Sequence, residues 1–93
     1  MISSFSCKET EKIWNGIQSR KFPSGIQDRA LRKLRQLDAA RTVDDLRLPP
    51  SNRLEVLKGE RRGHMSLRIN NQWRLCFVWN KDEAQEVAIV DYP

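Results

Sequence analysis

The sequence predicts an α+β fold in which an N-terminal two-helix hairpin packs on one face of a small antiparallel sheet. Apolar side chains recur at helical spacing over residues 7–40 and at strand spacing over residues 53–91. Pro49-Pro50 exclude a helix between these two halves. Because 93 residues suffice for one modest core, we expect a single domain over residues 1–93, in the order β-α-α-β-β-β-β.

The chain is expected to begin with a short strand and a first helix. Residues 2–5 are β-prone, and Ser6-Cys7-Lys8-Glu9 has the capping-box pattern, with serine at the cap and glutamate three residues later. The following stretch indicates a helix over residues 7–19. It places three large apolar side chains on one side, namely Ile13, Trp14 and Ile17.

A second helix is expected to follow Pro23 and to extend to about Ala40. It starts in another capping-box pattern, Ser24-Gly25-Ile26-Gln27. Apolar residues at steps of four, four and three form an inward stripe: Ile26, Ala30, Leu34 and Leu37. The outward positions are basic: Arg29, Arg32, Lys33 and Arg35. Such a hairpin must bury its apolar side, and the sheet is the partner that can cover it.

The register of the predicted sheet can be tested at the turn Asn70-Asn71-Gln72, since a slip of one residue exchanges the two faces of a strand. A three-residue loop sets three apolar pairs against the helices: Ile69 with Trp73, Leu67 with Leu75 and Met65 with Phe77. A two-residue loop would instead mix charged and apolar residues on one face. We therefore predict the three-residue loop and an antiparallel meander, with further strands around Leu54 and Ile89.

The same register places Arg68 opposite Arg74 on the exposed face of the sheet. Like charges directly opposite each other destabilise a strand pair, and a small domain has little stability to lose. An anion bound between the two arginines explains the pair. The alternative is that each arginine points into water or pairs with Glu55 or Glu86.

The overall charge favours a polyanionic partner. Seventeen Lys and Arg oppose twelve Asp and Glu, giving a net charge of +5, although an ordinary solvated surface remains the alternative. The segment Lys58-Gly59-Glu60-Arg61-Arg62-Gly63-His64 is a basic loop that lacks the GxxxxGK pattern of nucleotide-binding loops. Together with the two arginines, this loop indicates a site that binds a phosphate backbone. The expected RNA-binding residues are Arg53, Arg61, Arg62 and His64.

The chemistry that this chain offers is suited to RNA cleavage without a metal ion or cofactor. A single histidine and no ligand-spaced cluster argue against a metal site, and no Ser-His-Asp set is visible. RNA supplies its own nucleophile, the 2′-hydroxyl, so a protein need only align it, move protons and neutralise charge. Candidates for neutralising charge are Lys58, Arg68 and Arg74, and candidates for proton transfer are Glu55, Asp91 and Tyr92.

Four short motifs, in this order, resemble a HigB-type toxin of the RelE superfamily. They are Leu57-Lys58-Gly59-Glu60-Arg61, Ser66-Leu67-Arg68-Ile69-Asn70, Gln72-Trp73-Arg74-Leu75-Cys76-Phe77 and Val90-Asp91-Tyr92. The resemblance extends over the whole chain. It implies a RelE-like fold and the toxin of a bacterial type II toxin–antitoxin pair, a ribonuclease that enters the ribosomal A site and cuts translated mRNA.

The resemblance also implies partners and roles. A cognate helix-turn-helix antitoxin, HigA-like, neutralises such toxins, and the complex commonly contacts operator DNA through the antitoxin. By position, Lys58 matches a lysine that supports catalysis, and Arg68 and Arg74 match phosphate-binding arginines. Asp91-Tyr92 match a C-terminal acidic and aromatic pair.

Two positions depart from the family pattern. Some relatives have histidine where Glu55 stands, and many end in Asp-Tyr-His where this chain has Asp-Tyr-Pro, ending in Pro93. Because proline cannot transfer protons, the alternative is a non-catalytic relative that binds RNA or antitoxin and acts in operon repression. We also expect an acidic antitoxin surface to dock on the basic hairpin from Arg20 to Arg41.

The expected location is the cytoplasm. Residues 1–7 lack the basic and apolar parts of a secretory signal, and no apolar run has the length of a membrane span.

Overall fold

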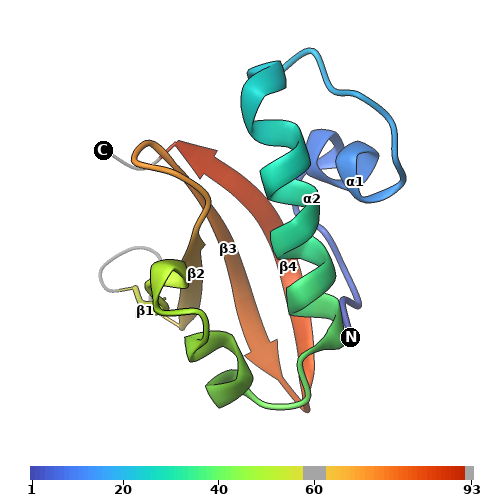
Figure 1. Cartoon of the computed structure of the whole chain (residues 1–93). Coiled ribbons are helices and arrows are strands. Elements are labelled where there is room, and N and C mark those ends of the chain that lie inside the picture. Colours follow the sequence, from blue (N-terminus) through green and yellow to red (C-terminus); the bar gives the residue numbers. More distant parts are fainter. Residues whose placement is uncertain (58–62, 92–93) are drawn as a thin grey trace.

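The computed structural model describes residues 1–57 and 63–91, and it confirms the α+β fold (Figure 1). The helices precede the sheet in the chain and lie on one side of it. The helical elements are α1 (Lys8–Trp14), α2 (Ser24–Ala39) and the 3-10 helices η1 (Val43–Arg47) and η2 (Pro50–Asn52). The expectation that Pro49-Pro50 exclude a helix here was wrong for these short 3-10 turns, because proline is tolerated in the first turn of a helix. The strands are β1 (Glu55–Val56), β2 (His64–Arg68), β3 (Trp73–Asn80) and β4 (Glu83–Asp91), paired antiparallel in the order β1-β2-β3-β4.

The predicted register of the β2–β3 hairpin is confirmed. Leu67 pairs with Leu75, Met65 with Phe77 and Arg68 with Arg74. The three-residue turn is closed by the N–H of Ile69, which donates to the carbonyl of Trp73 at 2.9 Å. The Asn70 side chain also accepts from the backbone N–H groups of Gln72 and Trp73, both at 2.8 Å, which makes this turn a local structure of its own.

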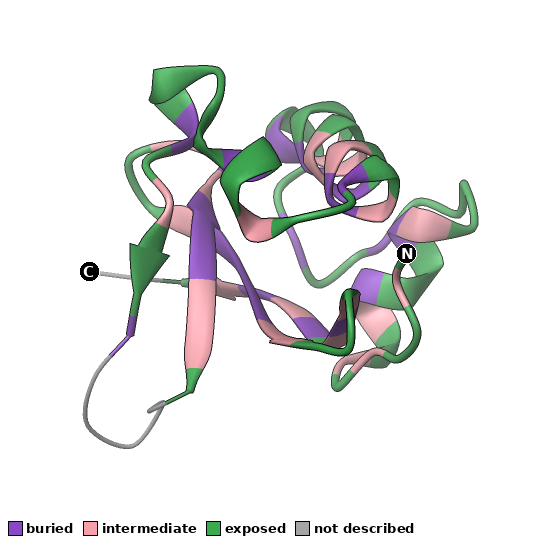
Figure 2. Ribbon diagram, turned by 90° about the horizontal axis from the view of Figure 1, so that it is seen from below, coloured by how far each residue is buried: buried purple, intermediate pink, exposed green. Residues whose placement is uncertain are grey.

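The core lies between α2 and the sheet (Figure 2). All four stripe residues of α2 are buried: Ile26, Ala30, Leu34 and Leu37. They belong to one hydrophobic cluster with residues from β2, β3 and β4: Leu67, Leu75, Phe77, Ala84, Val87 and Ile89. Alternate residues of β2 and β3 therefore face α2, as their period of two predicts.

The first helix ends five residues before the predicted Ser19. Gly16, with φ +80°, adopts the left-handed conformation that favours glycine, and its N–H donates to the carbonyl of Ile13 at 3.0 Å. The N–H of Ile17 donates to the carbonyl of Lys12 at 2.8 Å, which completes a Schellman motif. Ile17 thus lies outside the helix and is 55% exposed, so the prediction that it shares one side of a helix with Ile13 and Trp14 was wrong.

Both predicted capping boxes are absent from the described helices. Cys7 takes the cap position of α1, and Glu9 accepts a hydrogen bond from the Ser19 hydroxyl at 2.8 Å. Pro23 takes the cap position of α2, and the Gln27 amide donates to the carbonyls of Ser19 and Phe22. These polar side chains form hydrogen bonds with the segment between the two helices instead of capping the helix starts.

The N-terminal segment runs beside β4 without forming the regular strand that was predicted. Two isolated parallel bridges connect them, Ile2 with Ala84 and Phe5 with Val87. Glu86, with φ +52°, lies between these two points, where the pairing of β4 with β3 is irregular, and its N–H donates to the Ser4 hydroxyl at 2.9 Å. No helix in residues 1–57 and 63–91 has the length and apolar composition to cross a membrane.

Asp45 makes the acid stability of this fold testable. Its carboxylate accepts from the backbone N–H groups of Arg41 at 2.9 Å and Thr42 at 3.1 Å, and these bonds lower the pKa of Asp45. A carboxyl with a lowered pKa stabilises the fold above its unfolded pKa, and this contribution is lost as the pH falls through the folded pKa. We predict that Asp45→Ala lowers the free energy of unfolding near neutral pH and that the loss shrinks in acid.

Urea unfolding near pH 7 and at about pH 3 measures this difference. The matched control is Asp28→Ala, since Asp28 is exposed on α2. A loss for Asp45→Ala that stays the same at both pH values would contradict the prediction.

Candidate functional site

Arg74 is the most firmly held of the candidate residues. Its side chain is buried, with the residue only 9% exposed. Its Nε donates to the Ser66 hydroxyl at 2.7 Å, and its Nη2 donates to the carbonyl of Arg53 at 2.6 Å. The Glu55 carboxylate lies 3.9 Å from the same Nη2. The expectation that Arg74 stands exposed on an open sheet face was therefore wrong, and the alternative pairing with Glu55 is present.

Arg68 and Arg74 avoid each other although their Cα atoms are partners across the strands. The guanidinium of Arg68 binds the side chain of Asn71 in the β2–β3 turn, whereas Arg74 extends toward β1. The two like charges diverge, so the register alone does not require an anion between them. Both arginines still bring positive charge to the same end of the sheet.

Arg53 and Glu55 complete the surroundings of Arg74 from the neighbouring segment. Arg53 adopts a left-handed conformation with φ +44°, which turns its carbonyl toward Arg74 while its side chain is exposed. Because of this turn, β1 begins only at Glu55, although the strand was expected around Leu54. Glu55 pairs with Ser66, so β1 aligns the carboxylate with the hydroxyl that also holds Arg74.

Ser66 is the functional residue that sequence reasoning missed. It is fully buried, and both its hydroxyl and its carbonyl accept from Arg74, at 2.7 and 3.3 Å. The signal for it was its position between Met65 and Leu67, which turns it to the same face as the two arginines.

His64 lies two residues before Ser66 on β2, and Asp91 lies at the end of β4. His64 begins β2 rather than lying in a loop, and it pairs with Val78 at the far end of the strand from Arg68. Its Nδ1 is buried, and none of the described residues hydrogen-bonds it. Asp91 ends β4 opposite Trp73, so alternation directs it to the helix side of the sheet, and its carboxylate accepts from Gln72 at 3.2 Å.

The remaining predicted site residues, Lys58, Arg61, Arg62 and Tyr92, lie outside the described residues. Among the described candidates, the structure thus brings Arg53 and Glu55 together around Arg74, which Ser66 also binds, whereas Arg68 is only the Cα partner of Arg74. It does not add His64 or Asp91 to them.

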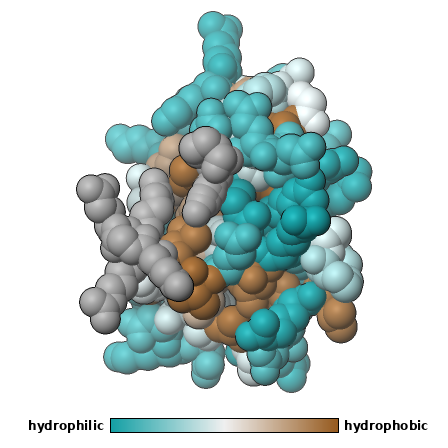
Figure 3. Space-filling view, turned by 90° about the vertical axis from the view of Figure 1, so that its left-hand side faces the viewer, coloured by the Kyte–Doolittle hydropathy of each residue, from teal (hydrophilic) through white to brown (hydrophobic). Residues whose placement is uncertain are grey.

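The surface beside β1 and β2 combines apolar and polar groups. Figure 3 shows a band of hydrophobic side chains between hydrophilic ones on this side of the molecule. Val56 on β1 is 65% exposed, and Val78 and Val90 share the face of Arg74 and are half-buried. An apolar surface beside fixed cations can bind a nucleic acid strand, because the bases pack on the apolar surface while the phosphates contact the cations.

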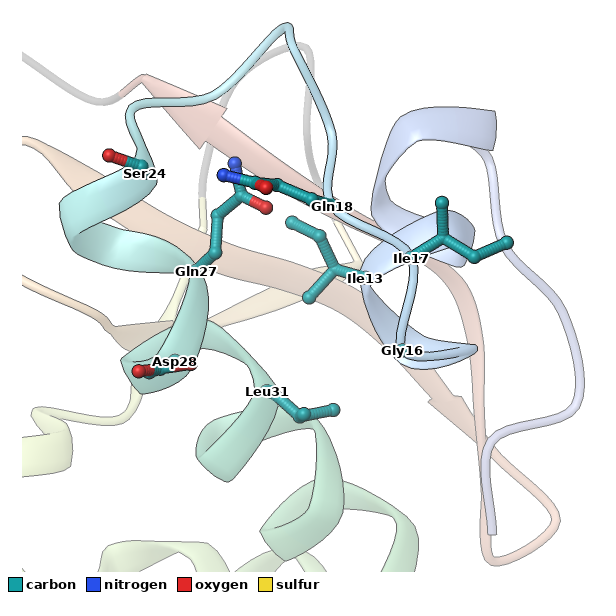
Figure 4. Close-up of a pocket in the computed structure, with 8 residues that line it drawn as sticks. All are labelled: Ile13, Gly16, Ile17, Gln18, Ser24, Gln27, Asp28 and Leu31. Atoms are coloured by element: carbon teal, nitrogen blue, oxygen red, sulfur yellow. The ribbon is translucent and has the colours of Figure 1, made fainter.

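A hollow of about 380 Å³ lies between the end of α1 and α2 (Figure 4). Ile13 and Gln27 extend into it, whereas Ile17 points away. The described residues that line it include Asp28 and no lysine or arginine. This hollow therefore lacks the charge that a phosphate requires.

Comparison with known proteins identifies relatives along almost the entire chain. The family model that matches residues 3–92 is described as a RelE-like toxin of type II toxin-antitoxin system HigB. Toxin HigB-1 of Vibrio cholerae serotype O1 is 50% identical over 80 residues, covering 85% of this chain and 84% of that protein. Endoribonuclease HigB of Proteus vulgaris is 27% identical over 92 residues, covering 99% of each.

A solved structure has the same fold at low identity. The YoeB-YefM complex from Staphylococcus aureus contains a chain that superposes with a TM-score of 0.62 at 18% identity, covering 100% of this chain and 98% of that one.

Proposed function

The chain belongs to the HigB family of RelE-like toxins of type II toxin–antitoxin systems, and from this we propose that it is an endoribonuclease that cleaves translated mRNA on the ribosome. The single observation that carries the activity is the fixed guanidinium of Arg74, held by Ser66, the carbonyl of Arg53 and Glu55. The name of the Proteus vulgaris relative, Endoribonuclease HigB, supports the same activity.

The proposed reaction uses the 2′-hydroxyl of the RNA as nucleophile. The 2′-oxygen bonds to phosphorus as the bond to the 5′-oxygen breaks, leaving a 2′,3′-cyclic phosphate and a 5′-hydroxyl. A base takes the proton of the 2′-hydroxyl, and an acid gives a proton to the leaving 5′-oxygen. No metal ion is required, because cationic side chains stabilise the charge that develops on the phosphate.

Arg74 is suited to charge stabilisation because its position is set before the substrate arrives. A guanidinium that is already oriented needs no reorganisation in the transition state, which is where preorganised charge gains its effect. Arg68 supplies a second positive charge at the same end of the sheet. Glu55, 3.9 Å from Arg74, is our candidate for the base.

The other predicted roles remain part of the proposal. Lys58 adds positive charge at the reacting phosphate, and Asp91 and Tyr92 act in proton transfer or in stacking on a base. The basic residues Arg53, Arg61 and Arg62, with His64, bind the RNA backbone.

The proposed protein partner is a cognate HigA-like antitoxin with a helix-turn-helix domain, through which the complex contacts operator DNA. The YoeB-YefM complex with which the fold superposes is itself named as a toxin–antitoxin assembly. A non-catalytic relative that acts only in repression is the second candidate, and Pro93 in place of a terminal histidine favours it.

Cleavage of a defined mRNA by the purified protein, with and without programmed ribosomes, separates these functions. We expect cuts within the translated region only when ribosomes are present. Binding of RNA or antitoxin without any cut under either condition would favour the repressor instead.

A further inference from the structure

A basic cleft of about 390 Å³ lies on the helix side of the molecule, where α2, η2 and the β2–β3 turn meet. Its volume falls in the range of small-ligand sites, roughly 300–1,000 Å³. The residues that line it are Arg29, Arg32, Lys33, Ser51, Arg68, Ile69 and Asn70. Four of these are cationic, and the described lining contains no carboxylate.

Two of the cationic side chains that α2 contributes to the cleft are held by hydrogen bonds. Arg29 donates to the carbonyl of Ile69 at 3.3 Å, and the Lys33 ammonium donates to the side-chain oxygen of Asn52. Asn52 is fully buried and donates in turn to the carbonyls of Leu46 and Leu48, both at 3.2 Å. These hydrogen bonds connect η2 with α2 beside the cleft.

Lys33 lines the cleft together with Arg29, which carries the same charge. Burial, and after it the charge of Arg29, lower the pKa of the Lys33 ammonium. A bound anion offsets both the burial of the Lys33 charge and its repulsion by Arg29. It neutralises the cluster and replaces lost water with charge-assisted hydrogen bonds. The cleft therefore offers an anion several cationic hydrogen-bond donors in one hollow.

Arg68 connects this cleft with the sheet. It lines the cleft and is the Cα partner of Arg74, so one cationic side chain belongs to both surfaces. A polyanionic chain that contacts Arg74 can continue past Arg68 into the cleft and meet positively charged side chains along this path.

We propose that this cleft is a second RNA site, which binds the sugar–phosphate backbone of an RNA strand that extends from the sheet. The inference rests on the proposed function and adds to it a phosphate contact remote from the reacting group. Arginine forks bind phosphate in bidentate fashion, which fits a hollow with two arginines of α2 beside Arg68.

An acidic protein surface fits the cleft less well. Ile69 is the one apolar residue in its described lining, and it is buried in the core. Stable protein interfaces place an apolar centre inside a polar rim, which this cleft lacks. The basic surface of α2 was expected to receive an acidic antitoxin, and measuring antitoxin affinity for the same variants separates that outcome from RNA binding.

The test compares two arginines of the same helix. Arg32 lines the cleft, whereas Arg35 is also exposed on α2 but does not line it. Both Arg32→Glu and Arg35→Glu change the net charge by the same amount, and neither residue belongs to the core. Affinity is measured by fluorescence anisotropy with a 2′-O-methyl RNA oligonucleotide, which excludes cleavage, and by co-sedimentation with vacant small ribosomal subunits.

We expect Arg32→Glu to weaken RNA binding about tenfold or more and Arg35→Glu to change it less than about threefold. For the milder Arg32→Ala, the slope of log affinity against log salt should fall by about 0.7, the value expected when one phosphate of a single strand is no longer neutralised. A weaker affinity for the oligonucleotide alone identifies the substrate strand as the ligand. A weaker affinity for the ribosomal subunits alone identifies ribosomal RNA.

Three results would overturn the second site. They are equal losses for Arg32→Glu and Arg35→Glu, no binding of either RNA by the wild-type protein, and unchanged RNA affinity with weakened antitoxin binding. Because the readout is binding, a failure of nuclease activity leaves this test intact, so the two proposals fail independently.

Discussion

Replacing Arg74 with alanine is expected to lower the rate of mRNA cleavage by roughly 100- to 1,000-fold, the usual effect of removing one preorganised charge-stabilising group. The substitution removes the guanidinium that Ser66 and the carbonyl of Arg53 hold in place. Growth arrest on induction should disappear as a consequence. Cleavage of a defined mRNA on programmed ribosomes measures the rate, and a growth curve measures the toxicity.

Two controls separate catalysis from folding for this variant. Arg74→Lys keeps the charge but cannot bind the Ser66 hydroxyl and the Arg53 carbonyl together, so we expect an intermediate rate. Arg47→Ala removes an exposed arginine that pairs with Asp44, three residues before it, and it should cleave at the wild-type rate. If Arg74→Ala stayed folded, bound antitoxin and remained as toxic as the wild type, its proposed role would be wrong.

Replacing Phe77 with alanine is expected to cost roughly 3–5 kcal/mol of the free energy of unfolding. Among the described residues, Phe77 is the largest side chain that is fully buried, and it belongs to β3 and to the core cluster. A small domain has a total stability of about 5–15 kcal/mol, so this loss brings the fold close to its limit. Urea unfolding followed by circular dichroism measures the change.

Val56→Ala is the matched control for Phe77→Ala. Val56 also belongs to the sheet, but it is 65% exposed on the short strand β1, and such a substitution usually changes stability by less than about 0.5 kcal/mol. Equal losses for the two variants would show that the core does not lie between α2 and β3.

The β2–β3 hairpin could be predicted to the residue because its determinants are local. Alternation with a period of two assigns each side chain to a face, and one turn of three polar residues sets the pairing. The apolar stripe of α2 could be predicted for the same reason, since helical spacing depends only on nearby positions.

The environment of Arg74 could be predicted only in part: Glu55 was named as a possible partner, but the burial of Arg74 and its bond to the carbonyl of Arg53 depend on parts of the chain far apart in sequence. Its partners are the carbonyl of Arg53, turned inward by a left-handed residue, and the carboxylate of Glu55 on a strand of only two residues. Neither has a pattern that single-sequence periodicity can detect. The early end of α1 was missed because Gly16 ends a helix only when its φ is positive, and the sequence alone does not give this angle.

The basic cleft was missed for a similar reason. The outward arginines of α2 were recognised as a charged face, but their approach to Arg68 depends on how η2 and the β2–β3 turn pack against the helix. Periodicity assigns a residue to a face of its helix, whereas the tertiary structure determines what lies opposite that face.

The most direct test of the central claim, that this protein cleaves RNA with the RNA's own 2′-hydroxyl, is a programmed-ribosome assay on an mRNA carrying one 2′-deoxynucleotide at the cut position. We expect the unmodified mRNA to be cut there and to leave a 2′,3′-cyclic phosphate, and the 2′-deoxy mRNA to remain intact at that position. Cleavage of the 2′-deoxy mRNA at the same bond would show that another nucleophile attacks, and it would contradict this claim.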